Sequence, residues 1–347
     1  MAHLVFQTAF PGDLFLSIPL IKRLREWDPH TPVVLACRPG LGGFFLSKGL
    51  VDEVIEIDKR SWSGRQRSRA ALNARQWDWI FVPHESARTA LWVRTLKASK
   101  GKVGFRKWWN IPIYSRRVRK PMAWPDALRQ LSLLTPLDAK LAENFKHIEG
   151  LRSPLDFTSM NLSKPEIPAW ASMNIGVQAK ISRRVFLAPG SVWATKRWTQ
   201  DGYETLARLL VQRGFGVELV GSPAEKALCD AIASHVPGVS NHAGKTSLGE
   251  LVDLFAQGGI LVCNDSGAMH AAAVAGLPTV AIFGPTVLSQ GFRPWNNRAV
   301  VVQRPLECRP CGKHGAKECP LGTHECMKTV SPGEVLAEVE KFSSGVL

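Results

Sequence analysis

The sequence has no apolar run long enough to cross a lipid bilayer, which argues against a transmembrane helix. Its first residues also lack the basic-then-apolar order that is typical of a secretory signal peptide. We therefore expect a cytoplasmic protein. In that compartment its seven cysteines are expected to be reduced thiols rather than a disulfide framework.

Other absences narrow the functional classes. No internal repeat or low-complexity tract is present, so repeat and fibrous architectures are excluded. The first expected strand is not followed by G-x-G-x-x-G, which disfavours a nicotinamide-dependent enzyme. No RNA-recognition, KH, helix-turn-helix or zinc-finger motif occurs, so only charge supports binding to nucleic acid.

The 347 residues carry a net charge of +15, and the charge is unevenly distributed. Residues 1–175 hold 27 Lys and Arg against 15 Asp and Glu, a net charge of +12. We therefore expect the first half of the chain to meet an anionic partner.

Two stretches of this first half contain no acidic residue. One lies between Glu85 and Asp126, where Trp108, Trp109 and Trp124 alternate with basic residues. The other follows Asp58 and contains Lys59, Arg60, Arg65, Arg67, Arg69 and Arg75, with Trp62. Basic residues with indoles suit an anionic membrane surface. Nucleic acid and a merely solvated surface are the alternatives.

Expected strands and helices alternate through both halves, which predicts an α/β protein with parallel sheets covered by helices. Pro- and Ser-rich residues over Ser153–Met173 are expected to form a linker. The sequence therefore predicts two Rossmann-like domains facing a cleft, with ligands at the carboxyl ends of the strands. The expected strands are His3–Ala9, Val33–Cys37, Val54–Ile57, Trp79–Val82, Val185–Ala188, Val217–Val220, Ile260–Cys263 and Thr279–Phe283. The expected helices are Leu14–Trp27, Ala87–Leu96, Gln200–Arg213, Ala224–His235, Leu248–Gln257, Met269–Ala275 and a last one from Ser331 to about Phe342.

The segment Gly259–Gly276 reads as a buried strand, a polar turn and an Ala-rich helix. Ser266 and Gly267 would offer free backbone N–H groups at the start of that helix, which suits a phosphate. The alternative is an ordinary capped turn between a strand and a helix. A second strand end, Gly190-Ser191, is followed by Lys196, which can supply a mobile positive charge to a phosphate.

Asp13 follows Gly12 where the first strand gives way to a helix. It is either an N-terminal helix cap or a carboxylate facing the cleft that acts as a general base.

At these motifs the chain resembles glycosyltransferase family 9, the ADP-heptose:lipopolysaccharide heptosyltransferases, and most closely the heptosyltransferase II type. The resemblance rests on GDLFLSIPLIKRL, APGSVWATKRW, VGSPAEK, NHAGKTSLGEL, NDSGAMHAAAVAGLPTVAIFGPT and a cysteine-rich segment near the C-terminus. It implies a GT-B fold, an ADP-sugar donor and an inverting displacement that requires no metal.

The resemblance also implies roles for individual residues. Asp13 would deprotonate the acceptor hydroxyl, and Lys196 would stabilise the leaving diphosphate. The donor would be bound by Gly190, Ser191, Glu225, Thr246, Asp265, Ser266, Gly267 and His270, although His270 also fits a packed residue of its helix. We expect the acceptor near Gly12, Arg60, Arg106, Lys107, Arg116 and Arg117.

Four cysteines near the C-terminus, Cys308, Cys311, Cys319 and Cys326, have a spacing that a structural zinc ion could use. Reduced thiols in a loop or an adventitious disulfide are the alternatives. Cys37, Cys229 and Cys263 lie on expected strands or helices and are expected in the core.

The sequence therefore predicts an inverting glycosyltransferase that moves heptose from ADP-heptose to the inner core of lipopolysaccharide. It would act at the anionic cytoplasmic face of the inner membrane, without nucleic acid. The alternatives are a GT-B transferase for another nucleotide sugar, or a non-catalytic basic protein that binds anionic lipid or nucleic acid. We expect an acceptor domain over residues 1–170, a donor domain over 171–330 and a helix over 331–347 that packs back on the first domain.

Overall fold

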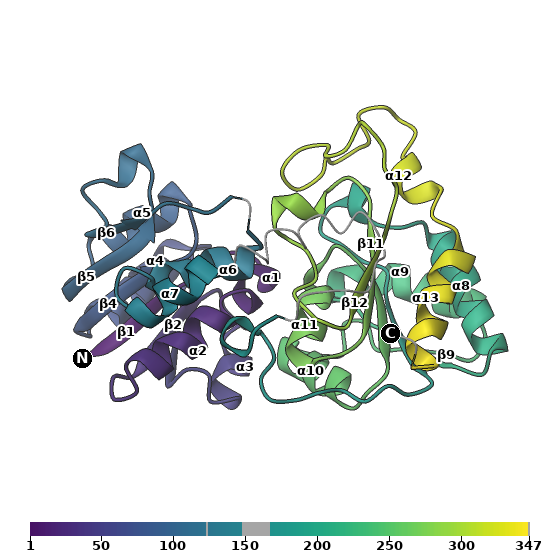
Figure 1. Cartoon of the computed structure of the whole chain (residues 1–347), viewed down its shortest axis with the longest axis horizontal. Helices are drawn as coiled ribbons and strands as arrows, with labels where there is room; N and C mark the ends of the chain where they lie inside the picture. The colour runs from purple at the N-terminus through teal and green to yellow at the C-terminus, as the bar shows by residue number, and fades with distance from the viewer. Residues whose placement is uncertain (123, 148–166, 346–347) are drawn as a thin grey trace. The chain divides into compact units, whose positions relative to one another are not determined.

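The computed structural model describes residues 1–122, 124–147 and 167–345 (Figure 1). Most of the expected linker, residues 153–166, lies outside this range. The chain forms two compact units. The N-terminal unit contains the described residues of Met1–Ser153 and Pro168–Met173, and the C-terminal unit contains those of Pro154–Ile167 and Asn174–Leu347.

The N-terminal unit is built on a six-stranded parallel sheet with the strand order β3-β2-β1-β4-β5-β6. The order reverses between β1 and β4, and in such sheets ligands bind at the carboxyl ends beside this point. The central strands are apolar and buried, as expected for strands covered on both faces. The strands are β1 (Ala2–Phe6), β2 (Val33–Cys37), β3 (Glu53–Glu56), β4 (Trp77–Val82), β5 (Ala98–Phe105) and β6 (Arg116–Val118).

The long helix expected over Leu14–Trp27 is wrong, because the chain forms two helices there. Pro19 stands at the second position of the second helix, where its missing N–H costs nothing. In one continuous helix the same ring would clash with the carbonyl group four residues earlier. The helices of this unit are α1 (Pro11–Phe15), α2 (Ile18–Trp27), α3 (Gly43–Ser47), α4 (Trp62–Asn73), α5 (Ala87–Arg94), α6 (Asp126–Leu131) and α7 (Ala139–His147).

The C-terminal unit repeats this architecture with a second six-stranded parallel sheet, ordered β12-β11-β10-β7-β8-β9. Its order reverses between β7 and β10. The strands are β7 (Arg184–Ala188), β8 (Gly216–Leu219), β9 (Val239–Asn241), β10 (Ile260–Asn264), β11 (Thr279–Phe283) and β12 (Ala299–Gln303). The helices are α8 (Gln200–Gln212), α9 (Lys226–His235), α10 (Leu248–Ala256), α11 (Gly267–Ala275), α12 (Glu325–Lys328) and α13 (Pro332–Ser343).

Figure 1 shows α8, α9 and α13 on one face of this second sheet and α10 and α11 on the other. Helix α13 begins with the expected capping box, in which Ser331 accepts from the Glu334 N–H. Its apolar side chains, including Val335 and Phe342, belong to the core that β7, β10 and α8 share. The buried side of α13 is therefore covered within its own unit, and the expectation that this helix also packs on the N-terminal domain stays a prediction.

The expected α/β class is thus observed in both units. Cys37, Cys229 and Cys263 are buried, as expected for core residues. In the described part of the chain, no helix is both long and apolar enough to cross a membrane.

Candidate functional site

Polar residues follow the strands of the second sheet at their carboxyl ends. Because these strands are parallel, the turns that follow them meet at one edge of the sheet. Ser191 follows β7, Glu225 follows β8, Asp265 follows β10 and Thr286 follows β11. The sequence-derived donor residues therefore come from neighbouring strand ends.

Lys196 and Asp265 form a buried ion pair at this edge. The Lys196 Nζ lies 2.6 Å from Asp265 Oδ2, and the two side chains are 8% and 5% exposed. Thr286 donates its hydroxyl to the same carboxylate oxygen over 2.7 Å. Asp265 Oδ2 therefore accepts from two donors, one of which is the Lys196 amine.

Asn264, the last residue of β10, ties the neighbouring turn to this pair. Its Nδ2 donates to the Pro189 carbonyl over 2.8 Å, and its Oδ1 accepts from the Trp198 N–H over 2.9 Å. The Ser191 hydroxyl donates to the Asp265 carbonyl over 3.4 Å. These bonds hold the segment that contains Lys196 against the start of α11.

The N-terminal end of α11 has hydrogen-bond donors that a ligand could use. Ser266 occupies the N-cap position, where such a side chain usually accepts from the first turn, yet it makes no capping bond. Its hydroxyl is buried, and within the described residues it has no hydrogen-bond partner. The first-turn N–H groups and this hydroxyl can therefore bind an anion beside the Lys196 amine. His270, one turn later on α11, is buried.

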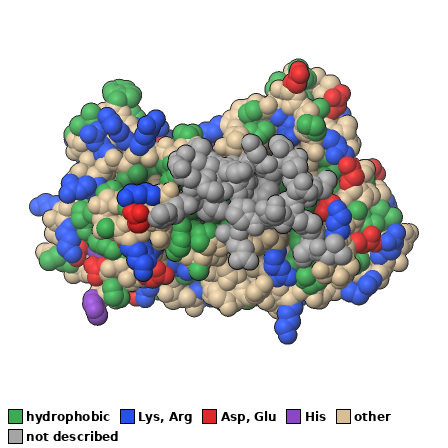
Figure 2. Space-filling model, in the orientation of Figure 1, with side chains coloured by type: hydrophobic (Ala, Val, Ile, Leu, Met, Phe, Trp, Pro, Cys, Tyr) green, Lys and Arg blue, Asp and Glu red, His purple; other side chains and the backbone are tan. Residues whose placement is uncertain are grey.

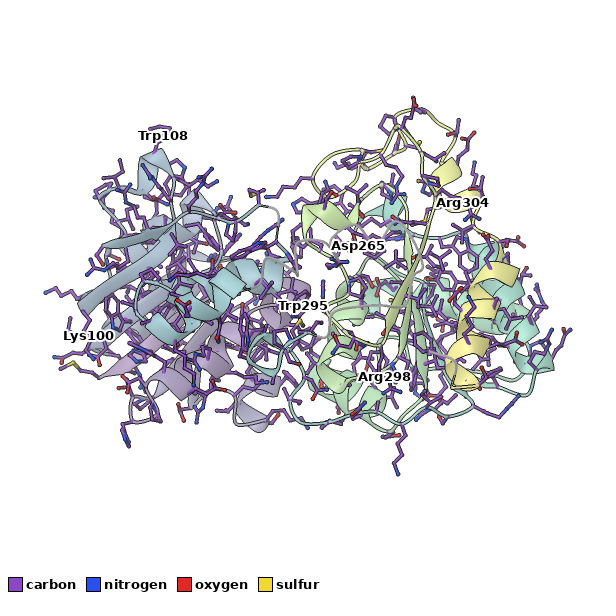
Figure 3. All side chains as sticks on the ribbon, in the orientation of Figure 1. Lys100, Trp108, Asp265, Trp295, Arg298 and Arg304 are labelled. Atoms are coloured by element: carbon purple, nitrogen blue, oxygen red, sulfur yellow. The ribbon has the colours of Figure 1, made fainter. Side chains whose placement is uncertain are left out.

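Gly190, which follows β7, allows the backbone to lie close to the Glu225 side chain. A Cβ atom at this position would lie 2.1 Å from the Glu225 carboxyl carbon, so a larger residue would require the Glu225 side chain to move. Glu225 in turn accepts from the N–H and the hydroxyl of Ser222. Thr246 follows β9 at the margin of the sheet, two strands from β7, and is not part of the Lys196 cluster. Figure 3 labels Asp265 and shows the side chains around it.

Asp13 lies in the first turn of α1, after the carboxyl end of β1. Its Oδ2 accepts from the Phe10 N–H over 3.2 Å, so the helix-cap geometry is present. The side chain is half-buried. A carboxylate that caps a helix can also accept a proton from a substrate, so capping and general-base chemistry are compatible.

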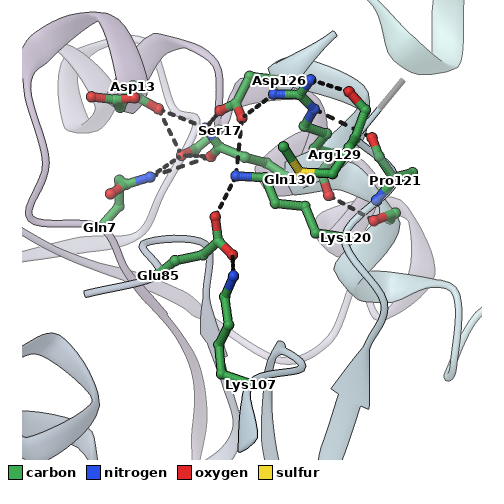
Figure 4. Close-up of polar contacts among 12 residues, drawn as sticks. Gln7, Asp13, Ser17, Glu85, Lys107, Lys120, Pro121, Asp126, Arg129 and Gln130 are labelled. Atoms are coloured by element: carbon green, nitrogen blue, oxygen red, sulfur yellow. Dashed lines mark hydrogen bonds and ion pairs between the residues drawn. The ribbon is translucent and has the colours of Figure 1, made fainter. Parts of the chain in front are cut away.

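A buried amide fixes the backbone of Asp13 (Figure 4). The Gln130 Nε2 donates to the Asp13 carbonyl over 3.2 Å and to Asp126 Oδ2 over 2.9 Å. Ser17 donates to the Gln130 Oε1 over 2.5 Å and to the Asp13 carbonyl over 3.2 Å. Gln7 donates to the same Gln130 oxygen. Helix α6 thereby locks α1 in place, a role that the sequence did not reveal.

A half-buried cation lies beside the same strand end. The Lys59 Nζ donates to the Thr8 hydroxyl over 2.8 Å, and the Arg38 Nε donates to the Thr8 carbonyl over 2.8 Å. Burial, followed by the charges of Arg38 and Arg88, lowers the pKa of Lys59 to about 8. This edge of the first sheet is therefore electropositive.

Arg116 and Arg117 lie on β6, and Arg106 and Lys107 directly follow its neighbour β5, whereas Arg60 precedes α4. The Lys107 Nζ lies 3.0 Å from Glu85 Oε1, and Arg60 pairs with Asp58. Arg106, Arg116 and Arg117 are exposed. Figure 2 shows that Lys and Arg side chains are frequent on the visible face of the N-terminal unit. Glu85 also pairs with Lys120, and the two cations hold the Glu85 pKa below its ordinary value against the effect of burial.

The four cysteines near the C-terminus lie in a loop before and within α12. Cys308 is exposed and Cys326 is buried, while the Cys311 thiol donates to the Cys308 carbonyl. Over the described ranges, no three His, Cys, Asp or Glu side chains converge in a way that could hold a metal ion. Zinc binding therefore stays a prediction.

Comparison of the sequence with known proteins finds heptosyltransferases. The family model for glycosyltransferase family 9 (heptosyltransferase) matches residues 65–321. Lipooligosaccharide heptosyltransferase 2 of Campylobacter jejuni is 35% identical over 46% of this chain and 51% of its own length. The chain thus matches only about half the length of several curated relatives. Lipopolysaccharide heptosyltransferase 2 of Escherichia coli K12 is 26% identical over 98% of this chain and 97% of its own.

Solved structures show the same fold. A glycosyl transferase family 9 protein from Veillonella parvula matches with a TM-score of 0.77 and 18% identity, over 99% of this chain and 97% of that one. The ADP-heptose lipopolysaccharide heptosyltransferase II of E. coli matches with a TM-score of 0.74 and 22% identity, over 100% and 99%. The GT-B fold class predicted from the sequence is confirmed.

Proposed function

Because the chain belongs to glycosyltransferase family 9, we propose that it transfers heptose from ADP-heptose to the inner core of lipopolysaccharide, with inversion at the anomeric carbon. The observation that carries this proposal is the Lys196–Asp265 pair beside the unsatisfied start of α11. Relatives named for heptose transfer, one of them matched over 97% of its length, support the choice of sugar.

The donor diphosphate would bind to the C-terminal unit. Lys196, the Ser266 hydroxyl and the N–H groups from Gly267 onward supply positive charge and hydrogen-bond donors of the kind that a leaving diphosphate needs. Asp265 is not proposed as a phosphate ligand, because its carboxylate would repel the phosphate. It acts instead by holding the Lys196 amine, with Thr286 as its second donor. Gly190 and Glu225 would lie toward the nucleoside, together with Thr246.

The acceptor would be activated on the N-terminal unit. The Asp13 carboxylate takes the proton of the acceptor hydroxyl, and the hydroxyl oxygen forms a bond to the anomeric carbon. The bond from that carbon to the diphosphate oxygen breaks, and ADP leaves with the electron pair. The charge that develops on ADP is stabilised by Lys196, so the reaction needs no metal ion.

The acceptor is a polyanion, and the basic surface of the N-terminal unit suits it. Arg60, Arg106, Lys107, Arg116 and Arg117 are proposed to approach its phosphates and acidic sugars. Trp108 is 85% exposed among these cations and is labelled in Figure 3. This combination supports a peripheral position at the cytoplasmic face of an anionic membrane.

Release of ADP tests the proposal. Purified protein is mixed with ADP-heptose, with and without a heptose-deficient lipopolysaccharide acceptor, before and after treatment with a chelator. We expect ADP release only with acceptor, undiminished by the chelator. Release from a different nucleotide sugar alone would favour the other GT-B transferase, and no release from any donor would favour a binding protein.

A structural zinc ion at the cysteine loop is a separate proposal. The four thiols of Cys308, Cys311, Cys319 and Cys326 would have to turn toward one centre when the ion binds. Metal analysis of the purified protein tests this: about one zinc per chain, lost in a Cys308→Ser and Cys311→Ser double variant, is expected.

A further inference from the structure

A groove lies between α4 and α5 of the N-terminal unit. Its lining includes neither Asp13 nor Lys59, although the Lys59 Nζ lies 5.8 Å from the centre of the Trp92 ring. The groove has a volume of about 470 Å³. It is lined by Trp62, Arg65, Gln66, Arg69, Arg88, Leu91 and Trp92. Three guanidinium groups and two indoles thus surround one hollow, a composition unlike that of an ordinary solvated surface.

The apolar part of the groove has a buried floor, formed by Trp92, and an exposed rim, formed by Trp62 and Leu91. Trp92 is 6% exposed and packs in the core of the sheet, so it forms the floor. The Arg69 guanidinium lies 5.2 Å from the centre of the Trp92 ring. Trp62 and Leu91 are 72% and 57% exposed, although both are large apolar side chains. Exposed apolar groups beside a hollow indicate a binding surface.

The polar part of the groove carries positive charge that is not neutralised. Neither α4 nor α5 contains an acidic residue. Within the part of the chain that the structure describes, Arg65, Arg69 and Arg88 form no ion pair with a carboxylate, whereas Arg60 and Arg75 nearby both do. The positive charge of these three arginines is therefore available to an anion.

We propose that the groove binds the anionic headgroup of a membrane phospholipid and thereby docks the N-terminal unit on the bilayer. The guanidinium groups would take the phosphate in bidentate hydrogen bonds, while Trp62 and Leu91 enter the level of the headgroups and the first acyl carbons. A single-stranded nucleic acid fits less well. Its bases stack on open aromatic faces, and of the two indoles that line the groove only Trp62 is exposed, because Trp92 is buried under Arg69. The inference rests on the proposed function only in that a lipopolysaccharide acceptor lies at a membrane.

Vesicle sedimentation tests the docking without catalysis. The full chain is mixed with phosphatidylcholine vesicles with and without phosphatidylglycerol. A groove variant, Arg65→Gln with Arg69→Gln, is compared with a control, Arg67→Gln with Arg94→Gln, which removes the same charge from exposed positions of the same two helices. Arg88 is left in place because its charge acts on Lys59.

We expect the groove variant to lose at least ten times more affinity for phosphatidylglycerol vesicles than the control loses. Trp62→Ala, which changes no charge, should also weaken binding several-fold, with an unchanged melting temperature. Equal losses in the groove variant and the control would overturn the proposal, because they would indicate long-range attraction only. Tighter binding to single-stranded RNA than to the vesicles, lost in the same groove variant, would also overturn it.

Transfer assays separate this inference from the proposed function. On an acceptor saccharide without acyl chains, the groove variant should keep the kcat and KM of the parent chain. On acceptor embedded in phosphatidylglycerol vesicles, its rate at low enzyme concentration should fall with its vesicle affinity. A loss on the soluble saccharide would assign the groove to the sugar site and contradict the docking proposal. If the parent chain transfers to neither acceptor, the proposed function fails, while the sedimentation result stands by itself.

Discussion

The two units share one strand order and differ at the edges where their strands end. In the C-terminal unit the charged and polar groups at this edge are buried and matched: Lys196 and Thr286 share the Asp265 carboxylate, and Asn264 joins two turns. In the N-terminal unit Arg38 and Arg88 lie near Lys59, and among the described residues none of these three cations forms an ion pair with a carboxylate. Asp13, at the same end of the sheet, is half-buried and caps α1. A preorganised edge suits a donor of fixed chemistry, and an electropositive one suits a bulky anionic acceptor.

Replacing the proposed base should have the largest effect on transfer. Asp13→Asn keeps an oxygen that can cap α1 but removes the proton acceptor, so kcat should fall by about 10²–10⁴-fold. Steady-state rates of heptose transfer measure this. Glu26→Gln, an exposed carboxylate in α2, is the control and should leave kcat unchanged. Near-normal turnover in Asp13→Asn would remove Asp13 from the mechanism.

Breaking the buried pair should affect both stability and donor binding. Lys196→Met leaves the Asp265 carboxylate buried without its cation, which costs about 3–5 kcal/mol of unfolding free energy. Adding Asp265→Asn removes the stranded charge and should restore most of the stability in denaturant titrations. Donor affinity should stay low in both variants. Recovery of donor affinity by the double variant would show that Lys196 acts only through folding.

Two N-cap serines of the C-terminal unit offer a matched test. Ser247 caps α10 by accepting from the Glu250 N–H, whereas the Ser266 hydroxyl at α11 has no partner within the described residues. Ser247→Ala should cost about 1 kcal/mol of stability and leave ADP affinity unchanged. Ser266→Ala should leave stability unchanged and weaken ADP binding about tenfold, as expected for a lost bond to a charged group. The opposite pattern would make α11 an ordinary helix.

The smallest effect is expected from pH at the N-terminal edge. Because the pKa of Lys59 is lowered to about 8, its charge is lost as the pH rises through that value. The kcat/KM for acceptor should therefore decline several-fold above pH 8 and stay level in Lys59→Arg. Between about pH 8 and pH 10.5, the ordinary pKa of lysine, the Lys59 amine is protonated in the unfolded chain but largely neutral in the folded one. Because the unfolded chain binds more protons in this range, the contribution of Lys59 to the free energy of unfolding rises with pH. A parallel decline in Lys59→Arg would assign the titration to another group.

Much of the polar cluster at the strand ends of the C-terminal unit could be predicted from sequence because its residues lie in contiguous motifs. Asn264 to Gly267 and Gly190-Ser191 each follow a short buried strand, so parallel pairing brings them together. Thr286 was missed because nothing in its local pattern shows that its hydroxyl faces Asp265. Strands β5 and β6 were not predicted, because β5 contains glycine and β6 is only three residues long, so neither shows a periodic pattern of apolar residues.

The N-terminal edge was harder to predict because its contacts are distant in sequence. Gln130 reaches the Asp13 carbonyl from 117 residues away. Lys107 lies in a stretch without acidic residues, yet Glu85 from the start of that stretch folds back to pair with it. A sequence stretch without acidic residues can therefore still lie next to acidic side chains in the folded protein.

The proposed separation of roles assigns donor binding to the C-terminal unit and acceptor activation to the N-terminal unit. It is tested most directly by calorimetric titration of ADP into Asp13→Asn and Lys196→Met. This separation predicts that Asp13→Asn binds ADP with the affinity of the parent chain while its kcat for heptose transfer falls by about 10²–10⁴-fold. It also predicts that Lys196→Met binds ADP at least tenfold more weakly. Normal ADP affinity in Lys196→Met together with a loss in Asp13→Asn would contradict it.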